Sequence, residues 1–132
     1  ERNLLPPLDL SMSALLDDLI DSGLIDETLF IISGEFGRTP NINKNSGRDH
    51  WGPVFTALFA GGGVQGGQVI GRSSDVGMAP TPTNLTTGQW DLTSGEVIRP
   101  EHVLRTLLVD AGITEDDADL RALPITALLK SS

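Results

Sequence analysis

The sequence contains no cysteine and no tyrosine, and aromatic residues make up only 5% of its 132 positions. Without cysteine, the chain can form no disulfide, no zinc site with thiolate ligands and no cysteine nucleophile. Any metal ion must therefore bind oxygen atoms or histidine nitrogens. Basic residues are also few, 9 against 18 acidic residues, which gives a net charge of −9. An acidic surface repels phosphate backbones and anionic lipids, so the composition argues against nucleic acid or membrane surfaces as partners.

Long apolar runs are absent too, since none approaches the ~20 residues that a membrane-spanning helix needs. We therefore expect no membrane insertion. The first residues, ERNLLPP, do not form a secretion signal and include no initiator methionine, so we expect a processed chain or a piece of a longer protein. In contrast, the 15 glycines and 8 prolines are numerous, and they predict a globular chain rich in loops.

Two segments have the spacing of amphipathic helices. In residues 8–22, apolar residues recur on one side and aspartates lie on the other, and Gly23 is expected to end the helix. A second helix is predicted from Pro100, at its first position, to about Asp110. Its predicted apolar side consists of Val103, Leu104, Leu107, Leu108 and Ala111. The sequence TEDD at 114–117 resembles a capping box that begins a final short helix.

Short apolar runs between these helices predict strands. Residues 29–32 (LFII) suit a strand buried on both faces of a mainly parallel sheet, and residues 54–60 and 68–70 are further candidates. Residues 72–95 are rich in Ser, Thr, Pro and Gly and predict irregular surface chain, either a linker or a long functional loop. The order of helices and strands predicts an α/β fold, in which residues 1–132 form one domain or part of a larger one.

The segment SGEFGRTP (33–40) is the first candidate for a functional site. It begins where a buried strand ends, and ligands of open α/β sheets gather outside the carboxyl ends of the strands. Glu35 offers an oxygen ligand or a general base, and Arg38 offers a planar cation that suits an oxyanion. The structural alternative is that Glu35 and Arg38 pair with each other at the edge of the sheet.

The segment GRDHW (47–51) is the second candidate. Neutral imidazole is a common metal ligand, and carboxylates often orient or join it, so His50 and Asp49 are candidate ligands. Successive side chains of an extended loop point apart, and binding of one ion by both therefore requires a bend. In the structural alternative, His50 caps the next strand and Trp51 covers the edge of the core.

Other motifs are weaker. His102, near the start of the second helix, is predicted to be solvated. The glycines at 61–63 lack the lysine of a phosphate-binding loop and indicate a turn. The acidic residues at 115–119 lack the spacing of an EF-hand. Asn84-Leu85-Thr86 matches a glycosylation acceptor, which is a pattern that often occurs by chance.

Together, GEFGRTP (34–40), GRDHW (47–51) and AGGGVQGGQVIG (60–71) resemble the bacterial family called domain of unknown function 1501. The resemblance extends from LLPPLD near the start to RPEHVLRTLL and PITALL near the end, and it concerns the C-terminal part of that family. Family members continue upstream through further strands and a Trp-Asp-Thr-His-like motif. The resemblance implies the three-layer αβα fold of the alkaline phosphatase and sulfatase superfamily, and it implies export of the parent protein to the periplasm or beyond.

The resemblance also implies chemistry that depends on a divalent metal ion, with phosphate or sulfate esters as small anionic substrates. In that superfamily an Asp-His pair at the end of a strand binds metal, and a later histidine completes a site. Here Glu35 stands in place of the aspartate, Phe36 in place of the histidine, and His50 corresponds to the later histidine. One strong ligand is therefore missing, and this chain alone is expected to be catalytically incomplete.

Two functions remain open at this stage. In the first, the chain is part of a hydrolase in which Glu35, Asp49 and His50 bind zinc, manganese, magnesium or calcium, while Arg38 and Arg48 hold the anion. In the second, it is a non-catalytic binding protein on a hydrolase-like scaffold, as the substitution by Phe36 suggests. A third view is that the two motifs only shape loops at strand ends.

Overall fold

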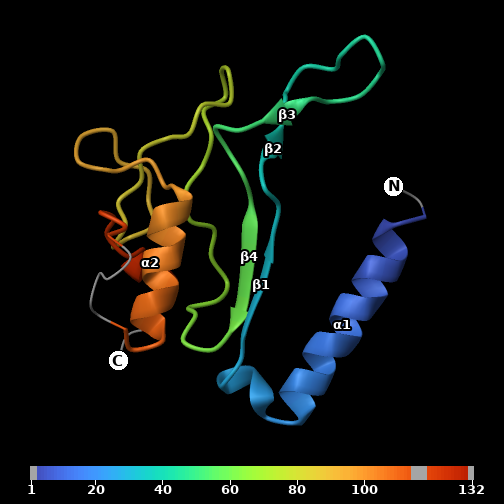
Figure 1. Cartoon of the computed structure of the whole chain (residues 1–132), viewed down its shortest axis with the longest axis vertical. Helices are drawn as coiled ribbons and strands as arrows, with labels where there is room; N and C mark the ends of the chain where they lie inside the picture. Colours follow the sequence, from blue (N-terminus) through green and yellow to red (C-terminus); the bar gives the residue numbers. More distant parts are fainter. Residues whose placement is uncertain (1–2, 114–118, 131–132) are drawn as a thin grey trace.

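The computed structural model describes residues 3–113 and 119–130 (Figure 1). The capping box predicted at 114–117 lies outside these residues. Within these residues, two α-helices, two 3₁₀-helices and four strands form a mixed α/β arrangement, as predicted. In chain order these elements are α1 (Leu5–Asp21), η1 (Leu24–Asp26), β1 (Leu29–Ser33), β2 (Gly37–Arg38), β3 (His50–Trp51), β4 (Ala57–Gly61), α2 (Pro100–Asp110) and η2 (Thr126–Leu128).

The strands pair as one long hairpin instead of the predicted parallel sheet. β1 pairs antiparallel with β4, with Ile31 opposite Phe59, and β2 pairs antiparallel with β3 farther along the same two segments. The continuous apolar run of β1 indicated burial on two faces, but such a run carries no information about strand direction. The direction follows from the connection, because a chain that folds back directly on itself pairs antiparallel.

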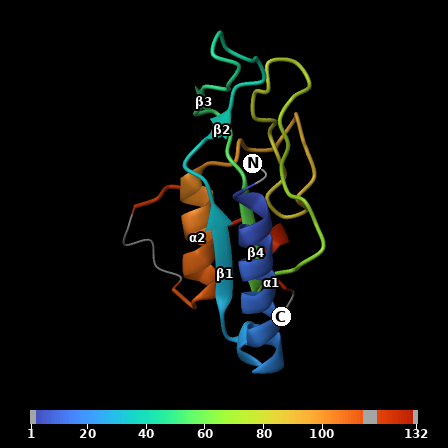
Figure 2. The ribbon, with the colours of Figure 1, turned by 90° about the vertical axis from the view of Figure 1, so that its right-hand side faces the viewer.

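The two α-helices lie on opposite sides of the β1–β4 pair (Figures 1 and 2). α1 begins three residues earlier than predicted, because Pro6 and Pro7 occupy its first turn, where backbone N–H groups need no partner within the helix. None of the residues of α1, all of which the structure describes, is buried. Within the described ranges, no helix is both long and apolar enough to cross a membrane.

α2 has the predicted bounds, Pro100–Asp110, but it presents a different side to the protein. Its fully buried side chains are those of His102 and Thr106, whereas Leu104, predicted on the apolar side, is 44% exposed. The prediction of a solvated His102 is therefore wrong. A histidine can be buried at low cost when both ring nitrogens are hydrogen bonded, and this is the case here.

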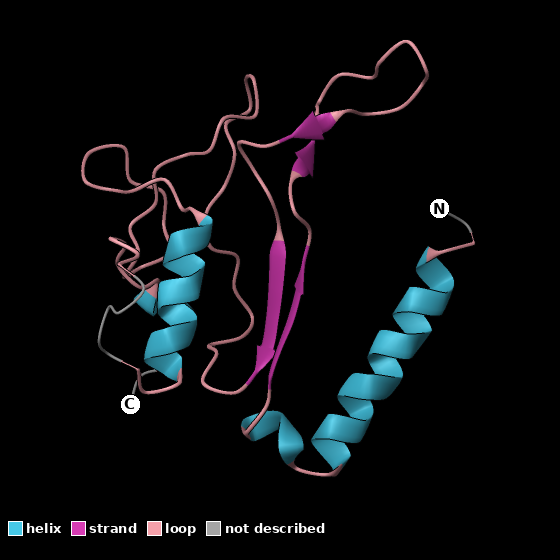
Figure 3. Cartoon of the chain, viewed as in Figure 1, coloured by secondary structure: helices cyan, strands magenta, loops and turns pink. Residues whose placement is uncertain are grey.

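The Ser/Thr/Pro/Gly-rich region is ordered by turns, although it is drawn almost entirely as loop (Figure 3). Asn84 Oδ1 accepts hydrogen bonds from the backbone N–H groups of residues 86 and 87, and Asp91 Oδ1 does the same for residues 93 and 94. These turns belong to a seven-residue repeat, NLTTGQW followed by DLTSGEV. Both turns pack around Thr83, which is fully buried and forms bridges with Trp90 and Glu96. The region is therefore a loop ordered by its own hydrogen bonds, and not a linker.

Other strand predictions hold in part. The strand predicted at 54–60 is observed at Ala57–Gly61, and residues 68–70 form no strand. The buried apolar side chains in the described part of the chain are Val64, Leu85 and Ile125. They lie along the C-terminal segment: Val64 pairs with Leu129, the Leu85 carbonyl accepts from Ala127 N–H, and Ile125 N–H donates to Thr106 of α2. A cavity of about 670 Å³ lies between β4, the segment after it and α2, so packing between hairpin and α2 is incomplete.

The C-terminal segment joins parts of the chain that are distant in sequence. Ala127 N–H donates to the Leu85 carbonyl at 2.9 Å, and Gln65 N–H donates to the Leu128 carbonyl at 2.8 Å. Lys130 N–H donates to the Gly63 carbonyl at 2.7 Å. Residues 125–130 thus hold the chain after β4 against the loop that precedes α2.

Candidate functional site

The β2–β3 hairpin contains both candidate motifs, and Gly37 determines how it joins the rest of the chain. Gly37 N–H donates to the Val54 carbonyl at 2.6 Å. A Cβ atom at this position would lie 2.7 Å from the same oxygen, which is closer than real Cβ contacts come. Only glycine therefore allows the two segments to approach at this point. The resulting register places Arg38 directly opposite His50 and Gly37 opposite Trp51.

One face of the hairpin carries an aromatic and basic group formed by Phe36, Arg38 and His50. The rings of Phe36 and His50 stack with centroids 3.9 Å apart, and the guanidinium carbon of Arg38 lies 5.7 Å from the centroid of Phe36. Arg38 and His50 are exposed, and Phe36 is half-buried. Phe36 thus holds a cation and an imidazole side by side at the surface. We call these three residues the hairpin face.

The other face carries Asp49 and Trp51. Both line a cavity of about 320 Å³ together with residues 39–43 and Gly77. Asp49 Oδ1 accepts a hydrogen bond from Asn43 Nδ2 at 2.8 Å. His50 does not line this cavity, because neighbouring residues of a strand project to opposite faces. The structure thus separates the side chains of Asp49 and His50, and the bend that joint metal binding requires is not present.

Arg48 supports the loop between β2 and β3. Its Nη1 donates to the carbonyls of Thr39 and Pro40 at 2.7 and 2.8 Å. Arg38 Nη1 in turn lies 3.5 Å from the Arg48 carbonyl. Two candidate anion-binding arginines are therefore brought to one end of the hairpin. Arg48 has a structural role there, whereas Arg38 makes a single long contact and keeps most of its donors for solvent.

Glu35 lies in the exposed turn between β1 and β2. The structural alternative, an ion pair between Glu35 and Arg38, is not observed: the side chains of Glu35 and His50 form no hydrogen bond or ion pair with any described residue. Both are thus available as ligands. Among residues 3–113 and 119–130, however, no three His, Asp or Glu side chains are grouped closely enough to hold a metal ion. Catalytic zinc sites use three protein ligands, so these residues supply at most part of such a set.

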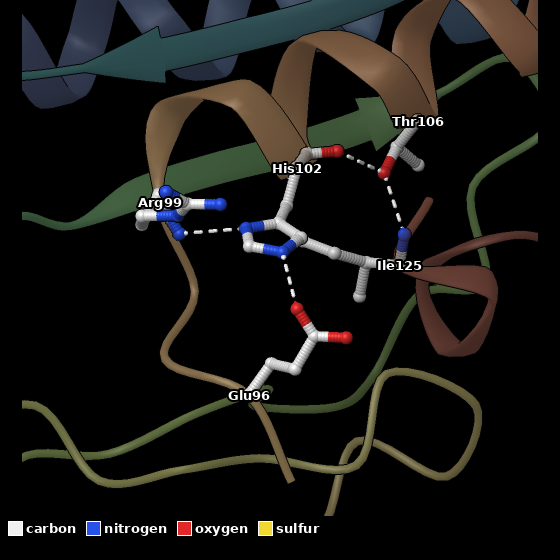
Figure 4. Close-up of polar contacts among 5 residues, drawn as sticks. All are labelled: Glu96, Arg99, His102, Thr106 and Ile125. Atoms are coloured by element: carbon white, nitrogen blue, oxygen red, sulfur yellow. Dashed lines mark hydrogen bonds and ion pairs between the residues drawn. The ribbon is translucent and has the colours of Figure 1, made fainter. Parts of the chain in front are cut away.

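A buried polar cluster around His102, at the start of α2, was missed by sequence reasoning (Figure 4). Arg99 N–H donates to His102 Nδ1 at 3.0 Å, so the ring proton resides on Nε2, which lies 3.2 Å from Glu96 Oε2. Thr106 Oγ1 donates to the His102 carbonyl at 2.6 Å and accepts from Ile125 N–H at 2.8 Å. Because His102 is fully buried and its ring nitrogens are engaged, the cluster stabilises α2 and offers no substrate site. One signal in the sequence could have indicated this burial. His102 is the third residue of the helix, where an acceptor side chain often accepts a hydrogen bond from the backbone N–H of the N-cap residue.

The described residues thus form a mixed α/β chain whose exposed hairpin carries an arginine and a histidine as cross-strand partners. The chain belongs to the family described as protein of unknown function (DUF1501), whose family model matches residues 1–93. The matched range contains the whole hairpin and ends before α2. No curated protein and no solved structure was found to match the chain.

Proposed function

We propose that this chain supplies the anion-binding part of a metal-dependent hydrolase that acts on phosphate or sulfate esters. The observation that carries the proposal is the direct cross-strand pairing of Arg38 with His50 on an exposed face. A guanidinium presents parallel N–H donors that match two oxygens of a phosphoryl or sulfuryl group. The adjacent imidazole, stacked on Phe36, is exposed on the same face of the hairpin.

His50 and Glu35 are the residues that would contribute to a metal site. A divalent ion bound there would act as a Lewis acid toward an ester oxygen. The described residues do not complete a ligand set, so we assign this chain a share of the site and derive no catalytic step from it. Arg38 would bind and orient the anionic group, and Arg48 would keep the loop in place through its bonds to Thr39 and Pro40.

The proposed scaffold is the three-layer αβα fold of the alkaline phosphatase superfamily. The position of α1 and α2 on opposite sides of the β1–β4 pair supports it (Figures 1 and 2). The two-stranded pair is small for such a fold, in which a sheet with several parallel strands forms the middle layer. In this proposal, β1 and β4 are part of that larger sheet.

The proposal is tested by measuring binding of inorganic phosphate, sulfate and zinc to the chain by calorimetry. Arg38→Met should weaken anion binding and leave zinc binding unchanged, whereas His50→Gln should weaken zinc binding. Lys44→Met is the matched control, because Lys44 is an exposed cation of the same loop outside the hairpin face. Equal loss of anion binding in Arg38→Met and Lys44→Met would show a general charge effect and would overturn the assigned site.

The second candidate function is binding of an anionic ligand without catalysis. The incomplete ligand set favours it. The longest available form of the protein should be assayed against aryl phosphate and aryl sulfate with added zinc, manganese, magnesium or calcium. Hydrolysis that is lost in His50→Gln supports the hydrolase. Anion binding without hydrolysis under any of these metals supports the binding protein instead.

A further inference from the structure

The cavity of about 670 Å³ lies next to the hairpin face. Its walls come from β4, the segment 64–73, the first turn of α2 and the C-terminal segment. Gly37 and Arg38 also line it, so Arg38 belongs both to the hairpin face and to the wall of the cavity. Sites for small molecules measure about 300–1,000 Å³. The cavity therefore has the size of a ligand site, and the cation of the proposed anion site lies at its edge.

The lining of the cavity is mainly apolar and carries no negative charge. Its apolar side chains include Phe55, Leu58, Phe59, Val64, Ile98 and Val103. Among the described residues that line it, none is acidic, although the chain has 18 acidic residues and a net charge of −9. The charged residues described there are Arg38 and Arg72, and the guanidinium carbon of Arg72 lies 5.4 Å from the ring centroid of Trp90. This combination suits a ligand that is both apolar and anionic.

The cavity occupies the edge of β4 that faces away from β1. Leu58 and Phe59 both line it, and because neighbouring residues of a strand project to opposite faces, the cavity reaches around this edge. The segment 64–73 lies on the same side of β4 (Figures 1 and 2). Further strands of the proposed larger sheet would therefore pair along the other edge of β1, and the walls of the cavity would stay in place.

We propose that this cavity holds the apolar alcohol part of an anionic ester, while Arg38 binds the phosphate or sulfate group at its edge. This inference rests on the proposed function and names its substrate class, esters of bulky alkyl or aryl alcohols. His50 does not line the cavity, so the anionic group stays on the hairpin face and only the carbon part leaves water. Burial of apolar surface is favourable in proportion to its area, and affinity should therefore increase with the size of the alcohol.

The first test compares binding of ethyl, butyl and hexyl phosphate to the chain by calorimetry. Affinity should rise about fourfold for each added methylene group that is buried. The heat capacity change of binding should become more negative along the series, which is the thermodynamic mark of apolar burial. Hexanol has the same carbon chain without the anion and should bind more weakly than hexyl phosphate. Equal affinities of the three phosphates, or hexanol that binds as tightly as hexyl phosphate, would overturn the proposal.

Variants locate the two parts of the ligand. Val103→Phe fills the cavity from α2 and should remove the gain from ethyl to hexyl phosphate, with inorganic phosphate binding unchanged. Val97→Phe is the matched control, because Val97 is 37% exposed and does not line the cavity, and it should keep the gain. Arg38→Met should weaken all the phosphates by a similar factor. Equal effects of the two phenylalanine variants would overturn the proposal, as would weakening by Arg72→Met and not by Arg38→Met, because the anion would then lie at the other cation.

The outcomes also separate this inference from the proposed function. If inorganic phosphate binds and is lost in Arg38→Met, but the alkyl chain adds no affinity, the inference is overturned and the anion site remains assigned. If inorganic phosphate, sulfate and the alkyl phosphates all fail to bind, both are overturned.

Discussion

Substitution of Thr106 by valine, a residue of nearly the same shape, should destabilise the protein because the backbone N–H of Ile125 loses its hydrogen-bond acceptor. Thr106 Oγ1 is fully buried and accepts the hydrogen bond of Ile125 N–H at 2.8 Å. Valine offers no acceptor, so this N–H would remain buried and unsatisfied. The His102 carbonyl, which also loses the hydroxyl, keeps the N–H of residue 106 as its helical partner. The cost is therefore that of a single unsatisfied donor, about 1–3 kcal/mol.

Two measurements check this value. The urea midpoint should fall by an amount that corresponds to this loss, with an unchanged slope. The amide of Ile125 should exchange with deuterium faster than in the unsubstituted protein, whereas amides of β1 should change little. Thr126→Val is the control, because Thr126 is exposed and its hydroxyl makes only a 3.5 Å contact with the Leu85 carbonyl. If both variants lose the same stability, the buried hydrogen bond is not the cause and the reasoning fails.

Two further predictions concern turns. Gly61→Ala should lower the free energy of unfolding by more than about 2 kcal/mol, since Gly61 has a φ of +78° and a Cβ would contact the Thr28 carbonyl. Gly66→Ala is the control, because a Cβ there would meet no other atom. Equal urea midpoints of the two variants would contradict this prediction. The Ser94 hydroxyl, followed by the N–H groups of residues 94 and 93, lowers the pKa of Asp91 below 3.8. This turn should therefore be fully stabilised above pH 4 and loosen as the pH falls through the lowered pKa, and an NMR titration that gives 3.8 or higher would refute it.

Local signals predicted the elements well where backbone chemistry dominates. Pro100 and Gly112 placed α2 correctly, since proline fits the first helical turn and glycine follows the last one. The run LFII placed β1 to within one residue. The direction of pairing and the buried side of α2 depend on tertiary contacts. His102 is buried because Arg99 N–H and the Glu96 carboxylate form hydrogen bonds with its two ring nitrogens. The spacing of apolar residues in the sequence does not reveal such hydrogen-bond partners.

The sequence predicted which segment carries the candidate site, but it did not predict which side chains of that segment lie on the same face. Residues 34–51 do form one hairpin, and the structure brings Arg38 and His50 together. It places Asp49 on the opposite face, which follows from the two-residue period of a strand once the register is known. The stacking of Phe36 on His50 could not be predicted, because it depends on a turn geometry that Gly37 and Val54 determine. Metal binding by Glu35, Asp49 and His50 stays a prediction.

The position of residues 125–130 has a consequence for the order of events during synthesis. The hairpin from 29 to 61 contains its own partners and can begin to pair while the rest of the chain is still being made. Two strands alone are marginally stable in water. The region around α2 can be completed only after residues 125–130 have been made. The N–H groups of Ile125, Ala127 and Lys130 donate hydrogen bonds to Thr106 Oγ1 and to the carbonyls of Leu85 and Gly63, respectively. A ribosome that stalls before residue 125 would therefore leave these three groups without their hydrogen-bond partners.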